Sequence, residues 1–157
     1  MANLKERLEG HQVIGLDTSI FIYHVEANPK YLPLTRAVLQ TIQSDRSNGV
    51  VSTITVMELT VHPWRLNRGD IARQYEVLLL NFPNLGLVDL TRGVARQGAK
   101  LRASYNLRPA DALQVATAMV SGATVWISND KRLKRLELDI EVIILDDFLD
   151  EGQEIQA

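Results

Sequence analysis

The sequence contains no cysteine, and this absence excludes disulfide bonds, thiolate metal sites and cysteine nucleophiles. It also lacks any apolar run that approaches the length of a membrane span. Its first nine residues mix acidic and basic side chains and contain no apolar core of the kind that defines a signal peptide. We therefore expect a soluble, cytoplasmic protein that does not associate with a membrane.

Neither sign of charge dominates the chain. Its 17 lysine and arginine residues and 19 acidic residues give a formal net charge of −2. A protein that coats nucleic acid through bulk electrostatics needs a strongly basic surface, so this charge argues against that class. The charge is compatible with a nuclease that holds its substrate through a local basic rim and bound cations.

The composition is that of one globular domain. With 157 residues, 46% of them hydrophobic, the chain is long enough to bury a real core. Short apolar runs alternate with helical patterns, which predicts an α/β fold with a mostly parallel five-stranded sheet covered by helices on both faces. We expect the domain to span residues 1–148, followed by an acidic, frayed tail at 149–157. The expected strands are 13–16, 50–52, 85–90, 124–127 and 141–145.

Two helix boundaries are predicted from single residues. The helix after the second strand is expected to start at Thr55 and to end at His62-Pro63, because proline breaks a helix interior. The next helix is expected to have Asp70 as its N-terminal cap, since a side-chain oxygen at that position accepts a free backbone N–H.

Four acidic residues occupy comparable places in this pattern. Asp17 follows the first strand, and Asp130 follows the fourth. Glu58 and Asp111 each lie in the first turn of an expected helix. In a parallel sheet, the carboxyl ends of the strands and the starts of the crossover helices share one edge, where such folds bind their ligands. We therefore expect the four carboxylates to converge on one pocket.

Each acid also has a structural interpretation. Asp17 and Asp130 could cap the helices that follow them. Glu58 stands three residues after Thr55, which is the spacing of a capping box, and Asp111 in a first turn is favoured by the helix dipole. For any one of them the structural role is the commoner. The coincidence of four acids at one edge of the sheet favours a shared function.

A pocket with four carboxylates must bind protons or cations. Two ionised carboxylates about 4 Å apart repel by roughly 4 kcal/mol at an effective dielectric constant of about 20. Oxygen ligands without cysteine or a histidine cluster suit the hard ions Mg²⁺ and Mn²⁺ better than zinc. Such an ion can acidify a water molecule and stabilise charge on a phosphodiester. The neighbouring polar residues Thr18, Ser128 and Asn129 are placed to orient the carboxylates.

Four pieces of the sequence carry a family resemblance. The most distinctive is Pro-Ala-Asp-Ala-Leu-Gln at 109–114, and the others are Ile-Gly-Leu-Asp-Thr-Ser at 14–19, Thr-Ile-Thr-Val-Met-Glu at 53–58 and Ile-Ser-Asn-Asp-Lys-Arg-Leu at 127–133. In their order and local context they resemble a PIN domain, the nuclease fold of VapC-type toxins in bacterial toxin–antitoxin pairs. The resemblance runs from about Val13 to Phe148.

This resemblance implies a three-layer α/β/α sandwich and a metal-dependent endoribonuclease that hydrolyses RNA with Mg²⁺ or Mn²⁺. It also implies a homodimer and a protein antitoxin that obstructs the active site. By their positions in the matching pieces, the catalytic and metal-site acids would be Asp17, Glu58, Asp111 and Asp130.

Five basic residues are candidates for contacts with RNA phosphates. Four of them follow the fourth acid directly, and one precedes the helix of the third. The alternative is a solvated helix face or a structural ion pair. The five residues are Arg108, Lys131, Arg132, Lys134 and Arg135.

Two other functions compete with the ribonuclease. A non-catalytic interaction module could keep the fold as a scaffold, although an unused acidic cluster would cost stability. Haloacid dehalogenase-like phosphatases also begin with a strand followed by aspartate, but they place a second acid two residues later. Here that position is Ser19, so we rank the phosphatase low.

Overall fold

The computed structural model describes residues 3–150, and a five-stranded sheet lies at its centre. The strand order is β3-β2-β1-β4-β5, and every neighbouring pair is parallel. Most of the tail expected at 149–157 lies outside the described residues. The strands are β1 (Val13–Leu16), β2 (Asn48–Ser52), β3 (Leu85–Val88), β4 (Val125–Ser128) and β5 (Glu141–Ile144).

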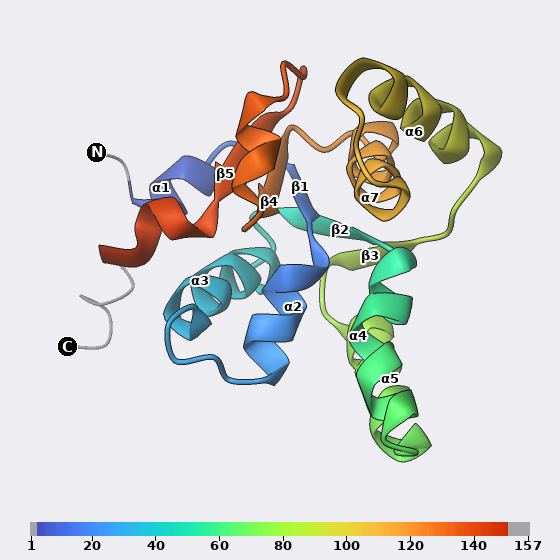
Figure 1. Cartoon of the computed structure of the whole chain (residues 1–157). Helices are drawn as coiled ribbons and strands as arrows, with labels where there is room; N and C mark the ends of the chain where they lie inside the picture. Colours follow the sequence, from blue (N-terminus) through green and yellow to red (C-terminus); the bar gives the residue numbers. More distant parts are fainter. Residues whose placement is uncertain (1–2, 151–157) are drawn as a thin grey trace.

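Helices cover both faces of the sheet, which confirms the predicted three-layer α/β/α fold (Figure 1). One hydrophobic core joins the sheet to α1 through α5, and a second joins its other face to α6, α7 and η1. The helices are α1 (Leu4–Leu8), α2 (Thr18–Val25), α3 (Leu32–Gln43), α4 (Ile54–Arg65), α5 (Gly69–Asn81), α6 (Arg92–Tyr105) and α7 (Pro109–Val120); the 3-10 helices are η1 (Lys131–Arg135) and η2 (Leu145–Phe148).

Strand β1 occupies the middle of the sheet and is buried on both faces. Ile14 and Leu16 are fully buried in the core of the α1–α5 side. Gly15 faces the other layer, where a Cβ atom would lie 2.6 Å from Cβ of Ala118 and 2.9 Å from Cε3 of Trp126. The absence of a side chain at this position therefore lets α7 approach the sheet closely, and α7 carries part of the candidate site.

Two predicted helix boundaries are wrong. Helix α4 continues through Pro63 to Arg65. A proline near the end of a helix removes few backbone hydrogen bonds, and here the ring is buried, which favours continuation. The cap position of α5 is Arg68 rather than Asp70, and Asp70 in the first turn instead pairs with the Arg68 guanidinium.

Helix α1 was not predicted from the sequence. Asn3 and Glu6 form a capping box, in which the side chain of each accepts from the backbone N–H of the other. Leu4 and Leu8 are fully buried against the core, so the short helix is stabilised by packing. None of the helices in the part of the chain that the structure describes is long and apolar enough to cross a bilayer.

Gly15→Ala should lower stability by about 1–3 kcal/mol, because neither the Ala118 methyl nor the packed indole can yield easily. This corresponds to a fall in Tm of roughly 2–4 °C per kcal/mol. Gly93→Ala is the matched control: in the first turn of α6 its Cβ would meet only Oγ1 of Thr91, at 3.7 Å. Urea unfolding of both variants measures the difference, and equal stability of Gly15→Ala and wild type would contradict the close approach.

Candidate active site

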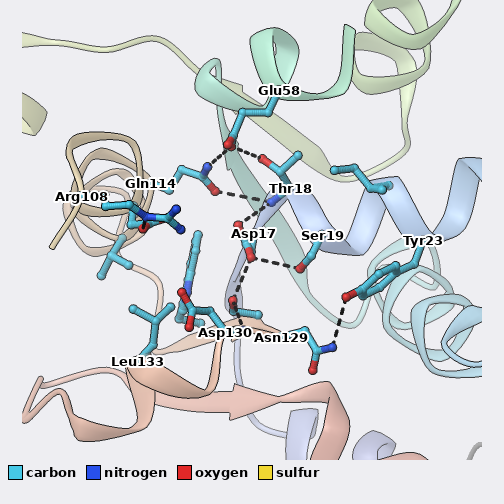
Figure 2. A pocket seen from close by; sticks show the side chains of 15 residues that line it. Asp17, Thr18, Ser19, Tyr23, Glu58, Arg108, Gln114, Asn129, Asp130 and Leu133 are labelled. Carbon is cyan, nitrogen blue, oxygen red and sulfur yellow. Dashed lines mark hydrogen bonds and ion pairs between the residues drawn. The ribbon is translucent and has the colours of Figure 1, made fainter. Parts of the chain in front are cut away.

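A pocket of about 410 Å³ opens at the carboxyl edge of the sheet, and all four predicted acids line it (Figure 2). Asp17 follows β1, and Asp130 follows β4. Glu58 comes from α4 and Asp111 from the first turn of α7. The parallel topology therefore brings together side chains that are more than a hundred positions apart in the sequence.

Asp17 is held by three neutral hydrogen-bond donors. Its Oδ1 accepts from the backbone N–H of Thr18 at 2.8 Å, and its Oδ2 accepts from Oγ of Ser19 at 3.0 Å and Oγ of Ser128 at 2.8 Å. Burial raises the pKa of Asp17, these bonds partly offset the rise, and the nearby Glu58 adds to it. A buried carboxylate with a raised pKa at the floor of a pocket is a strong candidate for a cation ligand.

Glu58 is fixed by residues from two other helices. Its Oε1 accepts from Oγ1 of Thr18 at 2.8 Å and makes a second, short hydrogen bond with Nε2 of Gln114. Since the single hydroxyl proton of Thr18 is used here, Thr55 is the donor in the 2.7 Å contact between the two threonines. The capping-box interpretation of Glu58 is wrong: α4 is capped at Thr53, without a side-chain cap bond.

The other two acids are paired with arginines. Oδ2 of Asp111 accepts from Nε of Arg108 at 2.9 Å. Both oxygens of Asp130 accept from the Arg132 guanidinium, from Nε at 2.9 Å and from Nη2 at 2.7 Å. This bond to Arg132 holds the pKa of Asp130 below its usual range. Each of these two carboxylates is therefore balanced by a neighbouring guanidinium.

Structural and site roles coincide at two of the acids. Asp17 caps α2 through the Thr18 N–H, and Asp130 caps η1 by accepting from the N–H of Arg132 at 3.0 Å. Capping therefore does not separate the two interpretations at these positions. It fixes the backbone next to each carboxylate and so the direction in which the side chain points.

The residues expected to orient the acids make different contacts. Thr18 and Ser128 hydrogen-bond Glu58 and Asp17, as described above. Asn129 also lines the pocket, but its Nδ2 donates to the Tyr23 hydroxyl at 3.1 Å, and its Oδ1 accepts from the N–H of Asp146 at 2.9 Å. Its described hydrogen bonds reach none of the four acids.

Sequence reasoning missed Gln114 and Ser19. Gln114 lies three residues after Asp111, so both share one face of α7, and this spacing could have indicated it. Gln114 also accepts from the N–H of Thr18 at 3.4 Å.

The pocket wall also includes Trp126, whose buried indole N–H has no hydrogen-bond partner among the described residues. Such an unsatisfied donor costs about 1–3 kcal/mol.

The five basic residues all have partners in this structure. Of the five, Arg108 lines the pocket. Lys131 pairs with Asp146 at 3.4 Å, and Lys134 pairs with Asp147 at 2.7 Å. Arg135 donates to the carbonyl of Tyr105 at 2.8 Å. Their contact with RNA stays a prediction.

The donor chemistry of the pocket suits a hard divalent cation. Within residues 3–150, no three acidic or histidine side chains converge closely enough to enclose a metal ion by themselves. Mg²⁺ commonly takes only one or two carboxylates and keeps several waters, so such convergence is not required. Asp17 fits that role best. Its carboxylate supplies oxygen ligands, and it has no cationic partner among the ion pairs of these residues.

Comparisons with known proteins agree with this fold, a parallel sheet covered by helices on both faces. A PIN domain family model matches residues 14–138. The chain therefore belongs to the PIN domain family. Membership of this family rules out the haloacid dehalogenase-like phosphatase as an alternative. Among proteins of curated function, none matches the sequence at a significant level.

Solved structures show the same fold at low sequence identity. VapBC-1 from nontypeable Haemophilus influenzae is 21% identical with a TM-score of 0.63, over 85% of this chain and 98% of that one. DNA-bound VapBC from Salmonella typhimurium is 19% identical with a TM-score of 0.64, over 85% and 98%. A toxin–antitoxin complex from Klebsiella pneumoniae is 19% identical with a TM-score of 0.61, over 85% and 97%.

Asp17→Asn should be more stable than wild type near neutral pH in the presence of a chelator. Because the pKa of Asp17 is raised by burial, its contribution to stability is present below the unfolded-state pKa and is lost as the pH rises through the folded-state pKa. The neutral amide avoids that loss. The stability advantage of Asp17→Asn over wild type should therefore shrink as the pH falls from about 7 to about 4, the second value being close to the pKa of an ordinary aspartate.

Thermal melts of both proteins across this pH range measure the effect, with Asp89→Asn as the control because Asp89 is exposed. Each kcal/mol corresponds to roughly 2–4 °C in Tm. A variant that is less stable than wild type at every pH would show that the hydrogen bonds of the carboxylate outweigh its burial.

Proposed function

We propose that this PIN domain is a divalent-metal-dependent endoribonuclease and the toxin of a toxin–antitoxin pair. One observation carries the proposal: four acids from four separate segments line one pocket at the carboxyl edge of the sheet. The similarity in fold to VapBC structures supports the toxin assignment. A toxin that cleaves RNA would act in the cytoplasm, where its substrate is.

The four acids have two different parts in this proposal. Asp17 and Glu58, held by neutral donors, form the fixed part of a site for Mg²⁺ or Mn²⁺. Asp111 and Asp130 complete it when their arginines turn away. The ion would supply Lewis-acid chemistry, acidifying a water molecule and stabilising charge on the phosphodiester. A scaffold without catalysis would have no use for the buried, unpaired charge of Asp17.

The arginines paired with Asp111 and Asp130 are the first RNA contacts in this proposal. The side chains of Arg108 and Arg132 are 67% and 62% exposed although both are ion-paired. Exposed pairs contribute little to stability, so exchanging a carboxylate for an RNA phosphate costs little. Lys131, Lys134 and Arg135 would extend the basic rim along η1.

A protein antitoxin and a second copy of the chain are the proposed protein partners. In Figure 1, α4 and α5 run side by side and project away from the sheet. Large exposed apolar residues gather on these two helices and just after α4, and a cluster of this kind marks an interaction surface. We assign this surface to the antitoxin. Its residues are Met57, Val61, Trp64, Leu66, Val77, Leu78 and Leu80.

The purified protein should cleave single-stranded RNA with Mg²⁺ or Mn²⁺ and stop when EDTA is added. Asp17→Asn and Asp111→Asn should each reduce the rate by a factor of about 100 or more, the scale expected for loss of a metal-site or charge-stabilising group. Gel analysis of a labelled RNA measures cleavage, and Asp89→Asn should cleave as wild type does. Equal activity in EDTA would refute the metal dependence, and unchanged activity of the two site variants would refute the site.

Mn²⁺ should stabilise the wild-type protein by mass action, since a ligand that binds only the folded state raises Tm. At about 100 times Kd the gain is about 2.7 kcal/mol, or roughly 5–10 °C in Tm. Differential scanning fluorimetry with and without MnCl₂ measures the shift, and Asp17→Asn should lose most of it. An equal shift in both proteins would place the ion elsewhere.

A further inference from the structure

Tyr23 stands across the pocket from Arg108. In Figure 2 the Arg108 guanidinium and the Tyr23 hydroxyl lie on opposite sides, with Asp17 between them. Tyr23 comes from α2, and its ring is partly buried against the core, while its hydroxyl points toward Asn129. No pattern in the sequence singles out this residue.

The direction of the Asn129 amide is fixed by the backbone. The N–H of Asp146 donates to Oδ1 of Asn129 at 2.9 Å, so Nδ2 must occupy the other end of the amide. Nδ2 then donates to the Tyr23 hydroxyl oxygen at 3.1 Å. A phenol can both accept and donate one hydrogen bond through this oxygen. Because Asn129 uses it as an acceptor, the hydroxyl proton of Tyr23 remains available to another acceptor, and Tyr23 lines the pocket.

One further contact holds Tyr23, and the partner in that contact is itself fixed by a hydrogen bond. Its ring stacks on that of Tyr31, with the ring centroids 4.2 Å apart and an angle of 18° between the planes. The Tyr31 hydroxyl donates to Oδ1 of Asp146 at 2.6 Å, and Lys131 pairs with the other oxygen of the same carboxylate. The Tyr23 hydroxyl oxygen is therefore positioned before any ligand arrives, which increases what a hydrogen bond from this group contributes to binding.

We propose that Tyr23 is a substrate-binding residue, whose O–H donates to a non-bridging phosphate oxygen of the RNA on the side of the acids opposite Arg108. The proposal rests on the proposed ribonuclease function. Four carboxylates on the pocket wall repel the RNA backbone, so a phosphate needs donors to approach. Arg108 supplies them on one side and Tyr23 on the other, and the backbone between these two contacts passes over the acids.

Tyr23→Phe removes only the hydroxyl and keeps the stacked ring. We expect KM for single-stranded RNA to rise by about 10-fold, the scale of one hydrogen bond to a charged group, while kcat stays close to wild type. The Mn²⁺-induced rise in Tm should be unchanged, because Tyr23 is not placed at the metal. Tyr75→Phe, a change of the same kind on α5, is the control and should leave KM unaltered.

Asn129→Asp tests the donor direction. An aspartate can accept from the Asp146 N–H as before but cannot donate to Tyr23, so the phenol turns its proton toward the new carboxylate and away from RNA. KM should rise as in Tyr23→Phe. In the double variant the two effects should not add, because both remove the same bond. Additive effects would show that Asn129→Asp acts through its charge alone. They would overturn the inference that Asn129 leaves the Tyr23 proton available to RNA.

RNA binding separates this inference from the proposed function. In the Asp17→Asn background, fluorescence anisotropy with a labelled single-stranded RNA should show a Kd about 10-fold weaker after Tyr23→Phe. That loss would support Tyr23 as an RNA contact even if the wild type fails to cleave. If the wild type cleaves with Mn²⁺ and Tyr23→Phe keeps wild-type KM and Kd, the Tyr23 inference is wrong and the ribonuclease stands.

Discussion

The buried carboxylate of Asp17 is the constraint on which the site depends. Taking a charge out of water costs several kcal/mol unless hydrogen bonds or a counterion replace the lost solvation. Here three donors replace part of it, two from the start of α2 and one from the end of β4. The pairing of β1 with β4 is therefore part of the site: the N–H of Asp17 itself donates to the carbonyl of Ile127 at 3.0 Å.

Around this charge the acids divide into two pairs. The inner pair, Asp17 and Glu58, is held by hydroxyl and amide groups that cannot leave without disturbing packed helices. The outer pair, Asp111 and Asp130, is held by arginines whose side chains are mostly exposed. The first arrangement fixes geometry, and the second gives a neutralised entrance whose charges can change partners. The proposed ribonuclease would bind both a cation and a polyanion at this site, and it would need both properties.

The sequence could predict the placement of the acids because that placement follows from topology. Alternating strands and helices put Asp17, Glu58, Asp111 and Asp130 at one edge, and all four line one pocket. Side-chain contacts were less predictable. Asn129 follows Ser128 directly, yet successive residues leave a strand in different directions, and its amide reaches Tyr23 and Asp146, which lie far away in the sequence. The end of α4 was missed for a similar reason, since burial of Pro63 is a tertiary effect.

Net charge says little about substrate for a site built in this way. The chain has a formal net charge of −2, and the acidic and basic residues near the pocket form ion pairs with one another rather than a basic patch. Such an arrangement attracts RNA weakly at long range, since opposite charges a few ångströms apart cancel beyond the screening length. Close to the pocket the balance changes, because each exposed guanidinium can turn from its carboxylate to a phosphate. In the proposed ribonuclease, recognition would then depend on contact geometry, and on groups that are held in place before the substrate binds.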